Sequence, residues 1–302
     1  MTLAFDGVPL LRRASDRFLG VAFQRIVFND IIEILETVDH DAKFRYVVTP
    51  NVDHVVRLSR QPELVDIYRG AWLTLCDSRP VRLAGWLFGR GIPVVTGSDL
   101  TATMFGRVMP HGSRVAVVAP SQLALDRLVE RFPQFEIHGH VPPAGLGGKP
   151  EELARCAAFA RDCRARFIFL AVGSPQSERI AWLMSRDPEA RGTAFCIGAS
   201  IEFITGLQRR APRWMQRAGL EWLHRVASDP GRLWKRYAFS LAPFLGLMTR
   251  EADRKAADAG WRPSPQTPLP VTRDRRSKAV VISRTGRRID ASKSRKGPQS
   301  AH

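Results

Sequence analysis

Residues 166–178 read RFIFLAVGSPQSE, an apolar run that ends in a short polar turn. The Phe, Ile, Leu and Val residues of this run predict a buried strand at 166–172. Gly173 and Pro175 then interrupt the apolar pattern, and Pro175 is well placed to open a helix at 175–185. A strand that leads through a tight turn into a helix is the repeating unit of a parallel sheet.

The same alternation continues on both sides of this stretch. Six strands are predicted, at 44–49, 72–76, 114–119, 135–141, 166–172 and 193–198. Helices are predicted at 53–64, 80–88, 98–109, 121–132, 150–163 and 175–185. The fold class is therefore predicted as α/β, a Rossmann-like, mostly parallel sheet flanked by helices. Ligands of such sheets bind beyond the carboxyl ends of the strands.

Positive charge is concentrated in the last third of the chain. The sequence has 302 residues, of which 44% are hydrophobic, and this is enough to bury a large core. Of the net charge of +17, residues 1–206 contribute +2 and residues 207–302 contribute +15. We therefore expect a nearly neutral Rossmann-like domain at 1–206, a cationic, helical appendage at 207–248 that meets an anionic partner, and a basic, disordered tail at 249–302.

Several classes of protein are disfavoured by the sequence. The four cysteines are widely separated and show no C-x-x-C spacing, so neither a zinc ribbon nor a disulfide framework is indicated, and a reducing cytoplasm is expected. The N-terminus has no continuous apolar core of a signal peptide. The apolar run at 238–248 is shorter than the ~20 residues that a membrane-spanning helix requires. We expect a cytoplasmic protein whose apolar run can lie on a bilayer but cannot cross it.

The common nucleotide-binding motifs are missing. No G-x-G-x-x-G follows a strand and no Walker loop is present, so dinucleotide and P-loop functions lose their main support. Two weak metal candidates, the D-H-D at 39–41 and the pair His138 and His140, have no partner cluster in the sequence. No metal site is predicted.

Five segments together resemble a known family. In chain order they are VVTPNVDHV (47–55), LCDSRPVRLAGWLFG (75–89), VVTGSDL (94–100), LAVGSPQSE (170–178) and the Arg- and Trp-rich stretch 209–237. This combination is similar to the bacterial WecG/TagA/CpsF glycosyltransferases, over roughly residues 20–237. The resemblance implies a metal-independent, inverting enzyme without a cofactor. Such an enzyme transfers a sugar from a UDP-sugar to a polyprenyl-diphosphate-linked acceptor.

The resemblance also assigns roles to individual residues. It places Thr49 and Asn51 in the donor pocket and makes Asp77 the general base. It implies further substrate contacts from the TGSDL and GSPQSE elements and from cations of the appendage: Thr96, Gly97, Ser98, Asp99, Gly173, Gln176, Ser177, Glu178, Arg225, Arg232 and Lys235. Guanidinium groups are suited to binding the diphosphate, because one guanidinium group can donate to two phosphate oxygens at once.

Some positions depart from the pattern of the family. Val94 stands where many members have arginine, Ser177 where glutamine is usual, and Ser78 where glycine is common. The identity of the donor sugar therefore stays open. The residues also allow plainer roles, because Asp77 could instead cap the next helix and Cys76 could be a small buried side chain. Ser98 and Asp99 could likewise be helix caps.

The stretch 209–237 interleaves Trp with Arg, a combination typical of membrane interfaces. Pro230 and Gly231 interrupt it, which predicts at least two helices. The expected partners are a UDP-sugar, a polyprenyl-diphosphate-linked saccharide and an anionic membrane surface, without nucleic acid. Two alternatives remain, a basic nucleic-acid-binding protein and a nucleotide-binding module without catalysis. Association between subunits stays open.

Overall fold

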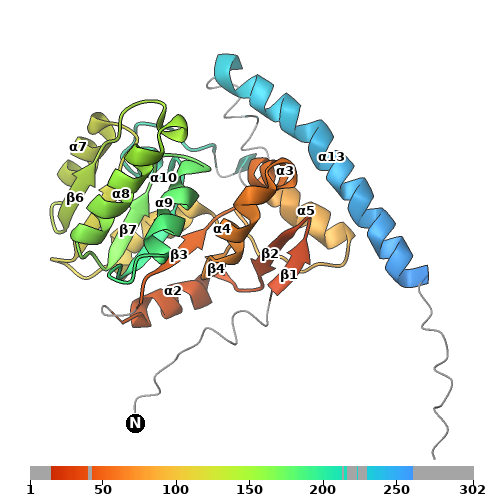
Figure 1. The fold of residues 1–302 in the computed structure, drawn as a ribbon, viewed down its shortest axis with the longest axis horizontal. Helices are drawn as coiled ribbons and strands as arrows, with labels where there is room; N and C mark the ends of the chain where they lie inside the picture. Colours follow the sequence, from red (N-terminus) through yellow and green to blue (C-terminus); the bar gives the residue numbers. More distant parts are fainter. Residues whose placement is uncertain (1–14, 40–42, 213, 216–222, 224–229, 261–302) are drawn as a thin grey trace, which may run out of the picture. The chain divides into compact units, whose positions relative to one another are not determined.

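The structure is a computed structural model that describes residues 15–39, 43–212, 214–215, 223 and 230–260. Its centre is a six-stranded sheet in the order β4-β3-β8-β7-β5-β6, in which every neighbouring pair is parallel (Figure 1). The strands are β3 (Arg45–Val48), β4 (Leu73–Thr74), β5 (Arg114–Val118), β6 (Glu136–His140), β7 (Phe167–Leu170) and β8 (Thr193–Cys196). All six predicted strands and the predicted fold class are confirmed.

The register of the central strands brings three loops together. Val48 at the end of β3 pairs with Cys196 at the end of β8, and Cys196 also pairs with Leu170 at the end of β7. These three carboxyl ends therefore lie level with one another. The TPN turn, the GSPQSE turn and the loop after β8 consequently open at the same edge of the sheet.

Both faces of the sheet are buried, as the continuous apolar runs require. Along β7, Ile168 and Leu170 belong to one hydrophobic cluster, whereas Phe167 and Phe169 belong to a second cluster on the opposite face. The first cluster includes residues of α3 (Val52–Arg60), α4 (Val65–Arg69), α5 (Arg79–Leu87), α8 (Pro150–Asp162) and α9 (Gln176–Ser185). The second includes residues of α2 (Phe28–Thr37), α6 (Gly97–Thr103), α7 (Gln122–Arg131) and α10 (Ser200–Ile204).

The six predicted helices are present with small changes. The helix predicted at 53–64 is α3 followed by a 3₁₀ turn at Pro62–Leu64, and the one predicted at 98–109 is α6 continued by a π-helical turn at Met104–Val108. The prediction omitted α2, α4, α10 and an antiparallel hairpin of β1 (Ser15–Phe18) and β2 (Val21–Gln24).

A long helix, α13 (Pro230–Gly260), forms the last described element. It begins at Pro230, where the sequence predicts a break between helices. Its last turns are residues 249–260, which were predicted to belong to a disordered tail. These residues read TREADRKAADAG and are rich in Ala, Glu, Arg and Lys, which favour helices. Phe244 of α13 is buried in the first hydrophobic cluster. Among the described helices, none has the length and apolarity needed to cross a membrane.

Candidate active site

An open cleft of ≈ 1330 Å³ lies at the carboxyl edge of the sheet. The loops after β3, β7 and β8 line it, together with parts of α3 and α13. Eight of the predicted site residues line this cleft: Thr49, Asn51, Asp77, Ser98, Gly173, Gln176, Ser177 and Glu178. The structure therefore brings together side chains that are up to 129 positions apart in the sequence.

The TPN turn is fixed by hydrogen bonds at both ends. The Thr49 hydroxyl donates to the carbonyl of Cys196 at 3.0 Å and so joins the ends of β3 and β8. Asn51 caps α3, because its side-chain oxygen accepts from the backbone N–H of His54 at 3.4 Å. The backbone N–H of Asn51 in turn lies 3.3 Å from Nδ1 of His54. The bond to Cys196 thus holds Thr49, and the reciprocal capping with His54 holds Asn51, at the mouth of the cleft.

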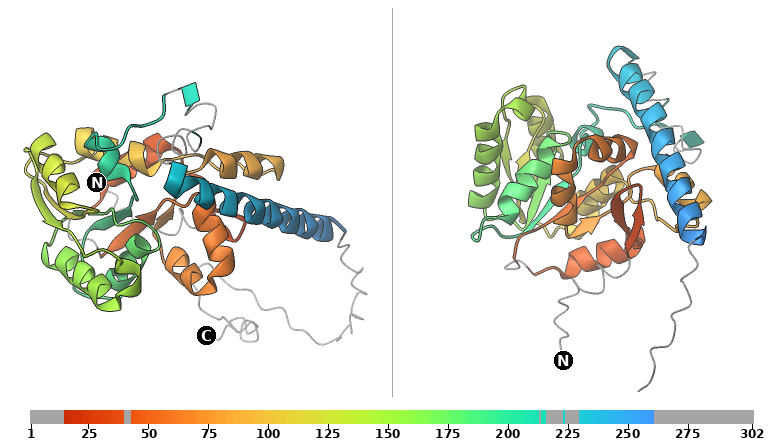
Figure 2. Two further views of the ribbon diagram at one scale, coloured as in Figure 1. Left: turned by 90° about the horizontal axis from the view of Figure 1, so that it is seen from above. Right: turned by 45° about the vertical axis from the view of Figure 1, so that its right-hand side comes forward.

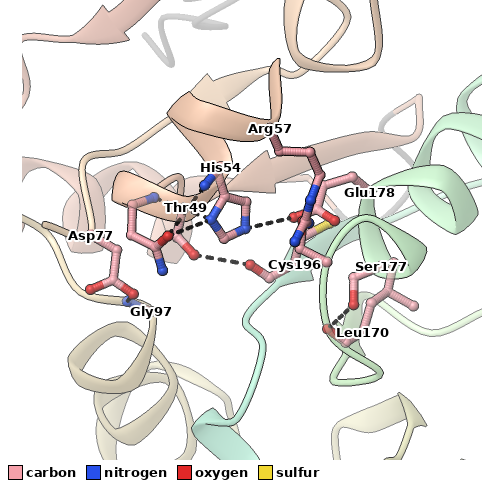
Figure 3. Close-up of polar contacts among 11 residues, drawn as sticks. Thr49, His54, Arg57, Asp77, Gly97, Leu170, Ser177, Glu178 and Cys196 are labelled. Carbon is pink, nitrogen blue, oxygen red and sulfur yellow. Dashed lines mark hydrogen bonds and ion pairs between the residues drawn. The ribbon is translucent and has the colours of Figure 1, made fainter. Parts of the chain in front are cut away.

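His54 connects the TPN turn to the GSPQSE element (Figure 3). Its Nδ1 lies 2.7 Å from Oδ1 of Asn51, and its Nε2 lies 3.4 Å from Oε1 of Glu178. Glu178 is only 3% exposed. Its second carboxylate oxygen, Oε2, is buried and has no hydrogen-bond partner among the described residues. A buried carboxylate oxygen without a partner is costly, which makes this oxygen a candidate acceptor for a ligand.

Asp77 is not the cap of the following helix. The cap of α5 is Ser78, whose hydroxyl accepts from the backbone N–H of Val81 at 3.2 Å. The carboxylate of Asp77 instead lies in the cleft, where Oδ2 accepts from the backbone N–H of Gly97 at 3.4 Å. Ser78, a departure from the family pattern, therefore performs the capping role and leaves the Asp77 carboxylate facing the cleft.

The TGSDL element forms several hydrogen bonds at this edge. Thr96 caps α6 by accepting from the backbone N–H of Asp99 at 3.0 Å, and its hydroxyl also lies 2.7 Å from Oδ2 of Asp99. Arg210 donates to Oδ1 of Asp99 at 2.8 Å and to the hydroxyl of Ser98 at 2.9 Å. Of these side chains only Ser98 is among the residues that line the cleft.

Two residues of GSPQSE also make structural contacts. The Ser177 hydroxyl donates to the carbonyl of Leu170 at 3.0 Å and is almost fully buried, so it caps the end of β7. A Cβ added at Gly147 would lie 2.7 Å from Nε2 of Gln176, so the Gln176 side chain packs closely on the backbone of the 3₁₀ turn at Leu146–Gly148.

Cations line the cleft at positions that the sequence analysis did not single out for this site. Arg57 and Arg60 of α3 and Arg209 are among the cleft residues, and Nη1 of Arg57 donates to the Ser174 hydroxyl at 2.8 Å. One turn of helix separates Arg57 from Arg60, a spacing that places both on one side of α3. Arg225 lies outside the described residues. Arg232 and Lys235 lie in α13, where only the backbone is described at these positions.

Cys76 and Cys196, the two cysteines near this edge of the sheet, are buried. Burial and the nearby Glu178 carboxylate raise the pKa of Cys196 well above its ordinary value, and burial raises the pKa of Cys76 to about 12. Both side chains are therefore neutral near pH 7 and poor nucleophiles. Within the described ranges, no group of three or more His, Cys, Asp and Glu side chains is arranged to hold a metal ion.

A parallel sheet that is covered on both faces and carries a polar cleft at its carboxyl edge defines a Rossmann-like, ligand-binding α/β protein. The model of the family "Glycosyl transferase WecG/TagA/CpsF family" matches residues 17–258. The chain belongs to this family, and it is a glycosyltransferase.

Two named relatives are similar over most of their length. A Bacillus spizizenii N-acetylglucosaminyldiphosphoundecaprenol N-acetyl-beta-D-mannosaminyltransferase is 26% identical over 200 residues, covering 64% of this chain and 75% of the relative. A Staphylococcus aureus (strain MW2) protein of the same name is 24% identical over 254 residues, covering 80% of this chain and 94% of the relative.

Proposed function

We propose that this enzyme transfers a sugar from a UDP-sugar to a polyprenyl-diphosphate-linked saccharide, with inversion at the anomeric carbon, in the synthesis of a bacterial surface polysaccharide. Support comes from the family match and from the names of the relatives, which act on a diphosphoundecaprenol-linked sugar. The observation that carries the proposal is the Asp77 carboxylate in a cleft shared with Thr49, Asn51 and Glu178. Because the sequence identity with these relatives is only 24–26%, the proposal does not assign their donor sugar to this enzyme.

Asp77 is proposed as the general base. It takes the proton of the acceptor hydroxyl as that oxygen attacks the anomeric carbon of the donor. The bond from this carbon to the diphosphate oxygen breaks at the same time, and UDP leaves with the bonding electrons. The hydrogen bond from the backbone of Gly97 at 3.4 Å supports the role, because it holds the carboxylate in place at the cleft.

Glu178 and His54 are proposed to orient the donor. The buried oxygen Oε2 of Glu178 would accept a hydrogen bond from a donor hydroxyl, while His54 holds the opposite oxygen of the same carboxylate. Hydrogen bonds to a charged acceptor are stronger than neutral ones, so this contact would favour a polyhydroxylated ligand. Thr49, Asn51, Gly173, Gln176 and Ser177 would shape the surrounding pocket.

The departing diphosphate needs positive charge. Arg57, Arg60 and Arg209 supply it among the described cleft residues. Arg225, Arg232 and Lys235 of the appendage remain proposed as further cations that contact the diphosphate. Preorganised cations near a leaving group stabilise the charge that develops in the transition state.

The enzyme is proposed to work at the inner face of the plasma membrane, attached peripherally. Support comes from the net charge of +15 in residues 207–302 and from the exposed apolar side chains Phe239, Leu241 and Leu245 of α13. Each cation near an anionic leaflet adds about 1 kcal/mol of attraction. The apolar side chains would add burial at the level of the headgroups.

Replacement of the base tests this function. Asp77→Asn keeps the shape of the side chain but cannot accept a proton, so we expect kcat for UDP release to fall ~100-fold or more, with donor affinity little changed. The measurement is UDP release with UDP-glucose, UDP-glucuronate, UDP-N-acetylmannosamine and its uronic acid as donors. Asp66→Asn, on an exposed ion pair of α4, is the matched control. Equal kcat values for Asp77→Asn and wild type would refute the assignment.

A further inference from the structure

Helix α5 carries an apolar outer surface on the sheet domain itself. Leu83, Trp86 and Leu87 are 60%, 71% and 60% exposed. Their spacing of three and four residues places them on one face of the helix. The opposite face, with Val81 and Ala84, is buried in the core. The helix is therefore already packed against the core through its buried face, and the three exposed apolar side chains do not contribute to this packing.

The surroundings of this face are cationic. Arg82 and Arg90 are exposed and lie next to it in the sequence. Trp and Leu framed by Arg are typical of a helix that lies at the level of lipid headgroups, where indole rings settle and cations meet anionic lipids. The charge and the apolar face together complement an anionic bilayer surface.

The position of α5 connects this face to the cleft. Its N-terminal cap follows Asp77, which lines the cleft. Helix α13 runs beside it, because Ser240 lines the same cleft and Nζ of Lys255 donates to the carbonyl of Phe88 at 3.3 Å, just beyond the end of α5. Figure 2 shows α5 and α13 extending toward the same side of the protein, and the contact between Lys255 and Phe88 joins the end of α5 to α13.

We propose that the outer face of α5, formed by Leu83, Trp86 and Leu87, docks on the anionic surface of the membrane. This contact belongs to the sheet domain and is separate from attachment through the appendage. The inference rests on the proposed function, because a lipid-linked acceptor has to present its hydroxyl to Asp77 from the bilayer. Docking through α5 holds that carboxylate next to the headgroup layer and so orients the cleft toward the acceptor.

The test is sedimentation of the full chain with vesicles of phosphatidylglycerol and phosphatidylcholine, in the absence of substrates. The triple variant Leu83→Ser, Trp86→Ser, Leu87→Ser should reduce the vesicle partition coefficient about 10-fold or more, since three apolar side chains no longer enter the interface. The matched control is Leu123→Ser, Val129→Ser, Leu183→Ser, three residues that are 56%, 46% and 40% exposed on α7 and α9. The control should sediment like the wild type.

A thermal melt of each variant separates loss of fold from loss of docking. If the triple variant is unstable, the single variant Trp86→Ser is used, and it should still weaken vesicle binding about threefold or more. Vesicle binding equal to that of the wild type in a folded variant overturns the proposal. A variant that changes only from dimer to monomer also overturns it, because the face would then contact a second copy of the chain.

Activity measurements separate this proposal from the proposed function. With a short-chain, water-soluble acceptor, the α5 triple variant should turn over like the wild type, whereas with acceptor embedded in vesicles it should lose about 10-fold or more, in line with its lost binding. If the wild type transfers no sugar to either acceptor, the proposed function fails, while the vesicle-binding result still decides the docking proposal.

Discussion

At the scale of single residues, the cleft depends on contacts that a motif does not contain. Thr49 and Asn51 are visible in the sequence as a TPN turn, yet their placement is set by His54 and Cys196, which the sequence analysis did not connect with them. His54 lies three residues beyond Asn51, a spacing typical of a capping box, and this signal could have identified it. The pairing with Glu178 could not have been predicted, because only the alignment of β3 with β7 and β8 brings these residues together.

Glu178→Gln tests the proposed contact between the buried carboxylate and the donor. The amide keeps the shape and can still accept from His54, but it removes the charge, so we expect KM for the donor to rise about 10- to 100-fold. The free energy of unfolding should stay level or increase, because a buried charge has been removed. Glu63→Gln, exposed in the 3₁₀ turn after α3, is the control. A loss of stability without a change in KM would mean that Glu178 is structural.

At the scale of elements, the strands were predictable because a parallel sheet buries both faces, and each of its strands is then a short, continuous apolar run. The β1–β2 hairpin was missed because its turn is Leu19-Gly20, in which both residues have positive φ. Asn-Gly or Asp-Gly is the usual signal for such a turn, and Leu rarely adopts this conformation. The full length of α13 was not predicted because residues 249–260 are mostly polar and charged, as in a disordered tail. The buried residue of α13 that packs against the core, Phe244, lies nearer the start of the helix.

The start of α6 gives a test at this scale. A Cβ added at Gly97 would lie 3.2 Å from the Thr49 hydroxyl and 3.4 Å from the Ser200 hydroxyl, so Gly97→Ala should crowd the cleft edge and lower the free energy of unfolding by about 1–3 kcal/mol. Gly106→Ala is the matched control, since nothing lies within 4 Å of its added Cβ. It should be neutral or stabilising by up to about 1 kcal/mol. Urea unfolding of both variants gives the comparison, and equal effects would contradict this account of Gly97.

At the scale of the whole molecule, a nearly neutral sheet domain holds the cleft, and the positive charge lies mostly beyond residue 206. The sequence alone located this asymmetry, since charge can be counted without a structure. The sequence did not predict the path of α13 along the sheet domain. This path runs from Ser240, which lines the cleft, to Lys255, which contacts Phe88. Under the proposed function, a helix that both lines the cleft and exposes apolar side chains would couple the reaction to the membrane.

The central claim is sugar transfer between two substrates, and its most direct test is the dependence of UDP release on both of them. With full-length enzyme in detergent, we expect one UDP-sugar of the panel to release UDP rapidly only when a polyprenyl-diphosphate-linked saccharide is present. The acceptor should gain the mass of one sugar for each UDP released. No UDP release from any donor in the presence of acceptor, together with tight binding of duplex DNA or RNA, would contradict the account.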